Sequence, residues 1–101
     1  MLAVLLAISP PVLRAQTPFA RTDAYADAAP ASAARSVPAL AAYLARSGRD
    51  DLTRARALYR WVTQHIDYDV AGLRSGRYGD LSAEGVLRRK LTICEGYANL
   101  V

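Results

Sequence analysis

The sequence predicts a mainly helical fold for residues 36–101. Apolar residues recur at helical spacing over 52–66, which favours a long amphipathic helix. Residues that commonly start helices stand before several short apolar runs, as expected for a series of capped helices. Only one brief segment after residue 66 suggests an extended chain, and we find no internal repeat.

The first of these helices is expected to begin at Ser36. Serine is a favoured N-cap residue, and Pro38 suits the first turn. Ser47 and Gly48 then end the helix. Its apolar stripe consists of Val37, Leu40, Tyr43 and Leu44.

The second helix, from about Leu52 to Ile66, is the clearest element of the chain. Asp50 or Asp51 is its expected N-cap. Its apolar face contains Leu52, Ala55, Leu58, Tyr59, Val62 and Ile66, and Trp61 widens this face as a core residue.

Residues 67–90 are expected to change from extended chain to loop to helix. Residues 67–70 leave the long helix as a short extended segment, and residues 72–80 contain three glycines and predict a loop. That loop lacks the Gly-Lys-Ser/Thr ending of a phosphate-binding loop. Ser82 is the expected cap of a short helix that ends near Lys90, and Gly85 weakens it by roughly 1 kcal/mol relative to alanine.

The first 35 residues do not have the composition of a folded domain. Residues 1–15 begin with an apolar run that is too short to span a bilayer, which takes roughly 20 residues, and they predict a signal peptide and an exported protein. A buried N-terminal strand or helix is the alternative. Residues 16–35 are rich in alanine and proline and lack large aliphatic residues, which predicts a linker. Part of it could dock as an extended arm through Phe19 or Tyr25.

Charge and composition exclude some classes of partner. The net charge is +4, and the thirteen basic residues, mostly arginine, are spread along the chain without interleaved aromatic residues. A nucleic-acid-binding protein would show a basic face or a known module, so we expect no nucleic-acid partner. Apart from the signal segment, we expect no membrane contact. The single cysteine excludes a disulfide within the chain.

That cysteine, Cys94, is the candidate nucleophile. Thr92 and Glu95 have the spacing of a capping box, which would place Cys94 at the second position of a helix. Unpaired N–H groups and the helix dipole favour an anion there, and a thiolate is such an anion. On position alone, a buried core cysteine remains the favoured alternative.

Other polar residues have simpler interpretations. His65 is the only histidine, and near a helix C-terminus a structural role is favoured over that of a base. Asp67, Asp69, Asp80 and Glu84 are expected to cap helices or stabilise loops and not to bind metal.

Two separated motifs resemble a known family. Residues 55–62 (Ala-Arg-Ala-Leu-Tyr-Arg-Trp-Val) and 65–69 (His-Ile-Asp-Tyr-Asp) resemble the helix that precedes the nucleophile in bacterial transglutaminase-like proteins. Residues 82–87, leading to 93–100 (Ile-Cys-Glu-Gly-Tyr-Ala-Asn-Leu), are similar to the segment that ends in the nucleophile motif. The superfamily also includes papain-like cysteine peptidases, peptide N-glycanases and the kyphoscoliosis-peptidase-like group. The resemblance covers residues 36–101.

The resemblance implies an α+β fold, a papain-like transglutaminase core. This chain would hold its N-terminal, mainly helical part, which ends in the nucleophile helix. The matching cysteine, Cys94, is then the nucleophile. The family takes its histidine and aspartate from a sheet later in the chain, so His65 lies on the wrong side of Cys94 to be that base. The approach to the cysteine, residues 90–93, lacks a glycine that the family often has.

The resemblance also implies a function. The complete enzyme would attack amide or peptide bonds of a protein or peptide through a thioester at Cys94, without a cofactor or metal, and end in hydrolysis or acyl transfer. The given chain would be a fragment that lacks the downstream histidine and aspartate and would be inactive and poorly folded alone. The alternative is a non-catalytic exported module that binds a peptide or protein through the same scaffold.

Overall fold

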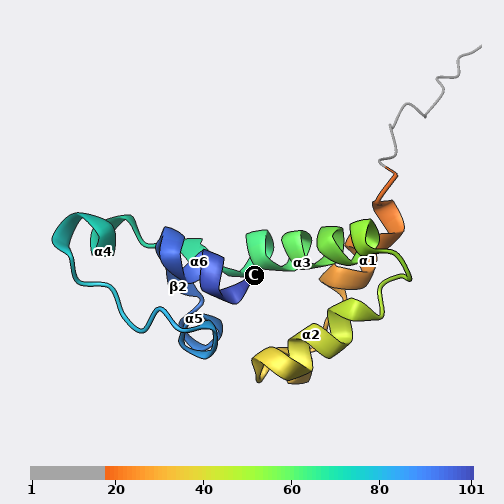
Figure 1. Cartoon of the computed structure of the whole chain (residues 1–101), viewed down its shortest axis with the longest axis horizontal. Coiled ribbons are helices and arrows are strands. Elements are labelled where there is room, and N and C mark those ends of the chain that lie inside the picture. The colour runs from red at the N-terminus through yellow and green to blue at the C-terminus, as the bar shows by residue number, and fades with distance from the viewer. Residues whose placement is uncertain (1–17) are drawn as a thin grey trace, which may run out of the picture.

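The computed structural model describes residues 18–101, so the signal peptide predicted for residues 1–15 lies outside the described part. The chain folds mainly into helices, with two very short strands (Figure 1). No helix within residues 18–101 has the length and apolar character needed to cross a membrane. The elements are α1 Ala20–Asp27, η2 Ala31–Ala34, α2 Val37–Ala45, α3 Asp51–His65, β1 Asp67–Tyr68, α4 Val70–Ser75, α5 Ala83–Arg89, β2 Leu91–Thr92 and α6 Cys94–Leu100.

Helix α3 is the centre of the structure. Its buried residues Trp61 and Val62 face a core that α1, α2, α5 and α6 also enter. Trp61, which is 2% exposed, is the largest side chain of this core. The core consists of Ala26, Leu40, Leu44, Ala57, Trp61, Val62, Ile66, Val86, Leu87 and Leu100. The helix expected over residues 52–66 and the core role of Trp61 are therefore confirmed, whereas Leu52 and Tyr59 of its predicted apolar face are 68% and 59% exposed.

Three predicted helix starts are confirmed by hydrogen bonds. The side chain of Ser36 accepts from the N–H of Ala39 at 3.2 Å and caps α2. The Asp50 carboxylate accepts from the N–H of Thr53 at 2.8 Å and caps α3. The Ser82 hydroxyl accepts from the N–H of Gly85 at 3.1 Å and caps α5. Each cap satisfies an N–H group that has no partner within its helix.

The two strands pair in parallel and join the end of α3 to the start of α6. Asp67 lies opposite Leu91, and Tyr68 lies opposite Thr92. The N–H of Asp67 donates to the Lys90 carbonyl at 3.0 Å, and the N–H of Asp69 donates to the Thr92 carbonyl at 2.8 Å. The short extended segment predicted after residue 66 is thus confirmed for residues 67–68, whereas Val70 already begins α4.

The segment predicted as a linker, residues 16–35, contains two helices in its described part, α1 and η2. Helix α1 packs along α3, and two bidentate ion pairs join them: Asp23–Arg56 at 2.7 Å and Asp27–Arg60 at 2.8–2.9 Å. The hydrogen bonds from Arg56 hold the pKa of Asp23 below its usual range, against the opposing effect of burial. Few large aliphatic residues are needed because charged groups hold the helix in place.

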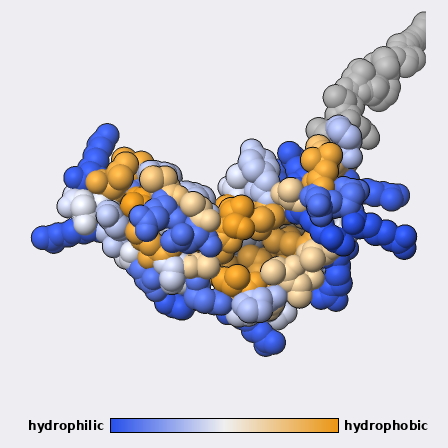
Figure 2. Space-filling model, viewed as in Figure 1, coloured by the Kyte–Doolittle hydropathy of each residue, from blue (hydrophilic) through white to orange (hydrophobic). Residues whose placement is uncertain are grey.

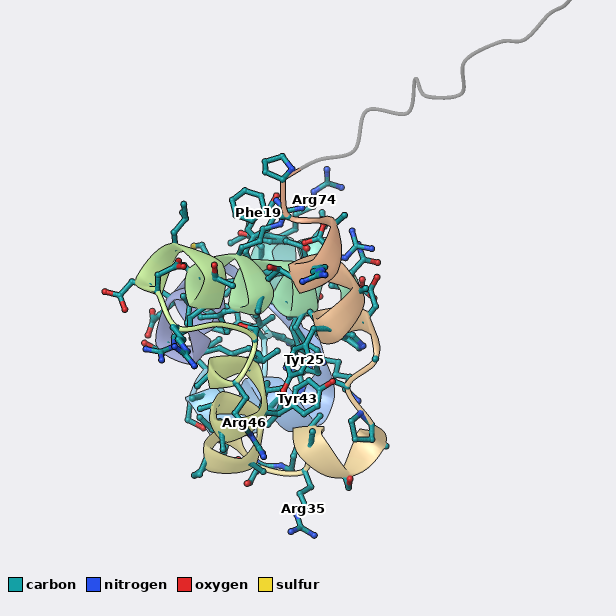
Figure 3. The ribbon with its side chains drawn as sticks, turned by 90° about the vertical axis from the view of Figure 1, so that its right-hand side faces the viewer. Phe19, Tyr25, Arg35, Tyr43, Arg46 and Arg74 are labelled. Atoms are coloured by element: carbon teal, nitrogen blue, oxygen red, sulfur yellow. The ribbon has the colours of Figure 1, made fainter. Side chains whose placement is uncertain are left out.

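Tyr25 does dock, but from a helix and not from an extended arm. Its ring stacks on Tyr43 of α2, with ring centres 4.5 Å apart (Figure 3). Each tyrosine hydroxyl donates a 2.8 Å hydrogen bond to the main-chain carbonyl of the other residue. Phe19 also docks: the Arg56 guanidinium carbon lies over its ring, 5.2 Å from the ring centre.

The loop predicted over residues 72–80 begins later than expected. Residues up to Ser75 belong to α4, and Gly76 ends this helix with a left-handed φ of 75°. The Asp69 carboxylate accepts from the N–H of Gly72 at 2.8 Å and caps α4, which explains why a glycine-containing segment forms a helical turn. Because glycines in residues 72–80 are typical of a loop, we did not predict this cap.

Candidate active site

Cys94 is exposed and is the first residue of α6. The N-cap is Ile93, not Thr92, and no side chain caps this helix. The predicted capping box of Thr92 and Glu95 was therefore wrong, and Cys94 stands one position earlier in the helix than expected. The alternative of a buried core cysteine is also wrong for this chain, because Ile93 enters the interior in its place with 5% exposure.

Thr92 cannot cap α6 because it is a fully buried residue of β2. It pairs with Tyr68, and its hydroxyl has no hydrogen-bond partner among the residues that the structure describes. Against it lies Gly96, where an added Cβ would collide with the Thr92 hydroxyl and come within 2.9 Å of Val86. Glycine at position 96 thus allows the strand and the first turn of α6 to pack closely.

The first turn of α6 presents main-chain donors beside the thiol. The first hydrogen bond of the helix runs from the N–H of Tyr97 to the carbonyl of Ile93 at 3.2 Å. The N–H groups of residues 94–96 precede this bond and have no partner within the helix. The other α-helices of residues 36–101 each have a side-chain cap.

Tyr97 fastens α6 to the end of α3. Its hydroxyl donates to the Ile66 carbonyl at 2.8 Å, and its ring stacks on Tyr68 of β1. Burial raises the pKa of Tyr97, with smaller contributions from Asp67 and Tyr68. Our sequence reasoning assigned no role to Tyr97 or to Gly96, although both lie in the Cys-x-Gly-Tyr-Ala motif that indicated the site.

Asn99 ties the other end of α6 to the preceding loop. Its side-chain nitrogen donates to the Leu81 carbonyl at 2.8 Å. Helix α6 is therefore attached to the end of α3 through Tyr97 and to the loop before α5 through Asn99.

His65 has the structural environment that we expected. One ring nitrogen, Nδ1, lies 2.8 Å from the Trp61 carbonyl, and the ring stacks on Trp61 with centres 4.2 Å apart. No hydrogen bond joins His65 to Cys94 in the described part of the chain. The structure therefore does not bring together these two residues as a thiol and its base.

The four predicted carboxylates mainly stabilise main-chain geometry. Asp69 caps α4, and Asp80 accepts from the N–H of Ser82 at 2.9 Å, which lowers the pKa of Asp80. Glu84 accepts from the N–H of Val37 at 3.1 Å, whereas Asp67 is exposed on β1. Among residues 18–101, no three histidine, cysteine or acidic side chains gather at a place that could hold a metal ion.

Cys94 lines none of the three main pockets on the described surface. Two of about 290 Å³ each are predominantly apolar and lie on either side of Leu58 and Val101, where Figure 2 shows a broad hydrophobic surface. A third, of about 280 Å³, includes His65 and Lys90. Because Cys94 lines none of them, the candidate site in this structure is an exposed thiol at a helix start and not a closed pocket.

An exposed cysteine opens α6, which packs against α5 and β2 and is joined to the end of α3 by the Tyr97 hydrogen bond. The family model described as Transglutaminase-like superfamily matches residues 38–101, which is more than half of the chain. The chain belongs to the transglutaminase-like superfamily. The helical fold with its small two-stranded sheet is consistent with part of the α+β core of this superfamily, as the sequence predicted.

Two curated relatives match significantly. Human (Homo sapiens) kyphoscoliosis peptidase is 32% identical over 82 residues, which cover 81% of this chain and 12% of that protein. Mouse (Mus musculus) kyphoscoliosis peptidase is 35% identical over 57 residues, which cover 56% of this chain and 9% of that protein. The chain therefore spans about a tenth of the length of these relatives. No solved structure matches significantly.

Proposed function

We propose that Cys94 is the nucleophile of a transglutaminase-like cysteine enzyme that acts on amide or peptide bonds of proteins or peptides. The observation that carries this proposal is the position of Cys94, which is exposed at the start of α6 in a chain of this superfamily. The thiolate sulfur would form a bond to the carbonyl carbon. The carbon–nitrogen bond would then break, and the amine would leave with a proton from a general acid.

Two features of the site support this chemistry. The uncapped N–H groups of residues 94–96 are donors of the kind that stabilise an oxyanion during acyl transfer. The resulting thioester would pass to water in hydrolysis, or to an amine in transfer. Both outcomes follow from the same intermediate.

The base and the group that orients it belong, in this proposal, to residues outside this chain. The only histidine here is His65, and its Nδ1 is engaged with the Trp61 carbonyl. A thiol nucleophile needs a base within hydrogen-bond reach and a third group to hold that base. The 101-residue chain alone is accordingly proposed to be inactive, and the protein to be exported through the segment at residues 1–15.

A second candidate is a non-catalytic exported module that binds a peptide or protein through this scaffold. It is favoured by one observation: the two predominantly apolar pockets of about 290 Å³ on the described surface do not include Cys94.

Trapping of the acyl-enzyme separates the two candidates. The full-length protein is incubated with peptides that carry side-chain and main-chain amides, quenched in acid and measured by mass spectrometry. We expect an adduct on Cys94, with the mass of the peptide minus the departing amine, and none in Cys94→Ala. Because Cys94 is exposed, this variant should keep the circular dichroism spectrum of the wild type. Peptide binding without any adduct would support the binding module instead.

A further inference from the structure

Helix α4 and the loop after it form an arm, residues 69–80, with an unusual surface. Val70 and Leu73 are each 49% exposed, and Tyr78 is 40% exposed. Val70, Leu73 and Arg74 lie three and four positions apart, and therefore share one face of α4. At this end of the molecule, hydrophobic and strongly hydrophilic surface lie side by side (Figures 1 and 2).

The arm is held in shape by its own hydrogen bonds. The Asp69 carboxylate caps α4, and the Ser75 hydroxyl accepts from the N–H of Arg77 at 3.2 Å. Gly76 ends the helix in the left-handed conformation that glycine adopts without strain. The apolar side chains are thus presented on a defined turn, and clustered exposed apolar residues commonly mark an interaction site.

Two arginines lie in the middle of the arm, and one aspartate lies at each of its ends. Arg74 and Arg77 are exposed, and neither forms an ion pair with a carboxylate among residues 18–101. The carboxylates within the arm are already engaged: Asp69 with the N–H of Gly72, and Asp80 with Ser82 and, at 3.4 Å, with Arg88. A partner that supplies carboxylates would complement this surface.

The arm begins beside the candidate nucleophile. The N–H of Asp69 bonds to the carbonyl of Thr92, and Cys94 follows two residues later, within about 7 Å of chain length. Figure 1 shows α4 beyond the N-terminal end of α6, opposite the end that carries the C-terminus. One of the two directions in which a peptide can leave Cys94 therefore runs toward the arm.

We infer that the α4 arm binds a peptide segment of the substrate that contains acidic and apolar residues next to the bond presented to Cys94. This inference rests on the proposed function and names its substrate class. The carboxylates would pair with Arg74 and Arg77, and the apolar side chains would cover Val70, Leu73 and Tyr78. A peptide fits better than a membrane surface, because recognition of anionic lipid typically uses clusters of about four to eight basic residues.

The test measures peptide binding without turnover. Full-length protein with Cys94→Ala is titrated against a fluorescein-labelled peptide of alternating glutamate and leucine, and against its counterpart with lysine in place of glutamate. Fluorescence anisotropy gives the dissociation constants. We expect tighter binding of the acidic peptide, and a loss on the order of tenfold when Arg74→Glu and Arg77→Glu are combined.

Matched variants separate this effect from charge alone and from misfolding. Arg35→Glu with Arg49→Glu makes the same change of net charge on exposed positions outside the arm; Figure 3 shows Arg35 pointing away from the body of the structure. This control should leave the affinity unchanged. Leu73→Ser, at a half-exposed position, should weaken binding of both peptides while the circular dichroism spectrum stays that of the wild type.

Three results would overturn the inference: equal affinity for the two peptides, an equal loss in the control variant, or arm variants that keep peptide affinity while losing binding to phosphatidylserine vesicles. Failure of the proposed function has a different signature, because the adduct on Cys94 would be missing in the wild type while arm-dependent peptide binding persisted. If the wild type forms the adduct but the arm variants bind the peptide unchanged, the arm does not recognise the substrate. The proposal that Cys94 is the nucleophile would then still stand.

Discussion

Gly96→Ala should loosen the helix that carries the candidate nucleophile. The added methyl group would lie 2.8 Å from the Thr92 Cβ and 2.9 Å from the Val86 Cγ2, and still closer to the Thr92 hydroxyl. Thr92 and Val86 are both fully buried, so neither has free space to move into. Overpacking of this kind costs about 1–3 kcal/mol, and the helix propensity of alanine returns about 1 kcal/mol.

We expect a net loss of up to about 2 kcal/mol in the local stability of α6, which corresponds to up to roughly 30-fold faster exchange of its amide hydrogens. Hydrogen–deuterium exchange with peptide-level mass spectrometry on the full-length protein measures this. Thr92→Ala removes the closest clashing atom, so the double variant should lose less stability than the sum of the two single variants.

Gly79→Ala is the matched control. Its added methyl group meets only the flexible end of the exposed Arg89 side chain, so it can displace at most the 3.2 Å hydrogen bond from Arg89 to the Leu91 carbonyl. Amide exchange in α6 should therefore stay at the wild-type rate. If Gly96→Ala likewise left the exchange of α6 unchanged, the close packing of strand β2 against this helix would not position Cys94, and the reasoning would fail.

Three further changes test the contacts around the site. Tyr97→Phe removes the hydrogen bond to the Ile66 carbonyl and should destabilise α6 by about 1 kcal/mol, measured by the same amide exchange. Asp69→Ala removes the cap of α4 and should cost about 1 kcal/mol, with exchange rising in residues 70–75, whereas Asp69→Ser should retain most of the cap. The pKa of Asp23 is lowered in the folded state by Arg56, so its stabilising effect on α1 is present above the unfolded value of about 3.9 and is lost as pH falls further. Exchange in α1 should rise below that pH, and Asp23→Asn should flatten the pH dependence; an unchanged acid response would contradict the ion pair.

The parts of the fold that the sequence predicted well have local causes. Ser36, Asp50 and Ser82 cap their helices through hydrogen bonds to residues three positions away, so a short window contains all the information needed. The periodicity of α3 is equally local, and its buried face includes Trp61 as expected.

Helix α1 was missed because its stabilising contacts are distant in sequence. Its composition is poor in large apolar residues, and composition alone predicted a linker. The helix is held by Asp23 and Asp27, each paired with an arginine 33 residues away, and by the stacking of Tyr25 on Tyr43. A charged residue in a sequence does not reveal such a partner.

The cap of the cysteine helix was mispredicted for a related reason. Threonine is favoured both as an N-cap and in strands, so the spacing of Thr92 and Glu95 fits either structure. Pairing with β1 decides between them, because it places Thr92 opposite Tyr68 and buries the threonine hydroxyl. Local capping rules therefore placed Cys94 at the second position of the helix, whereas it is the first.

The exposure of Cys94 follows from the burial of its two neighbours. Thr92 ends β2 with 0% exposure and Ile93 has 5%, so the chain turns into α6 with both side chains directed into the interior. Gly96 lets the first turn approach the strand, and Tyr97 ties the same turn to the end of α3. Because these contacts come from β2, α5 and α3, the thiol is held by the core and not by a mobile loop. A nucleophile needs such positioning, since its rate depends on reaching the carbonyl carbon in a fixed geometry.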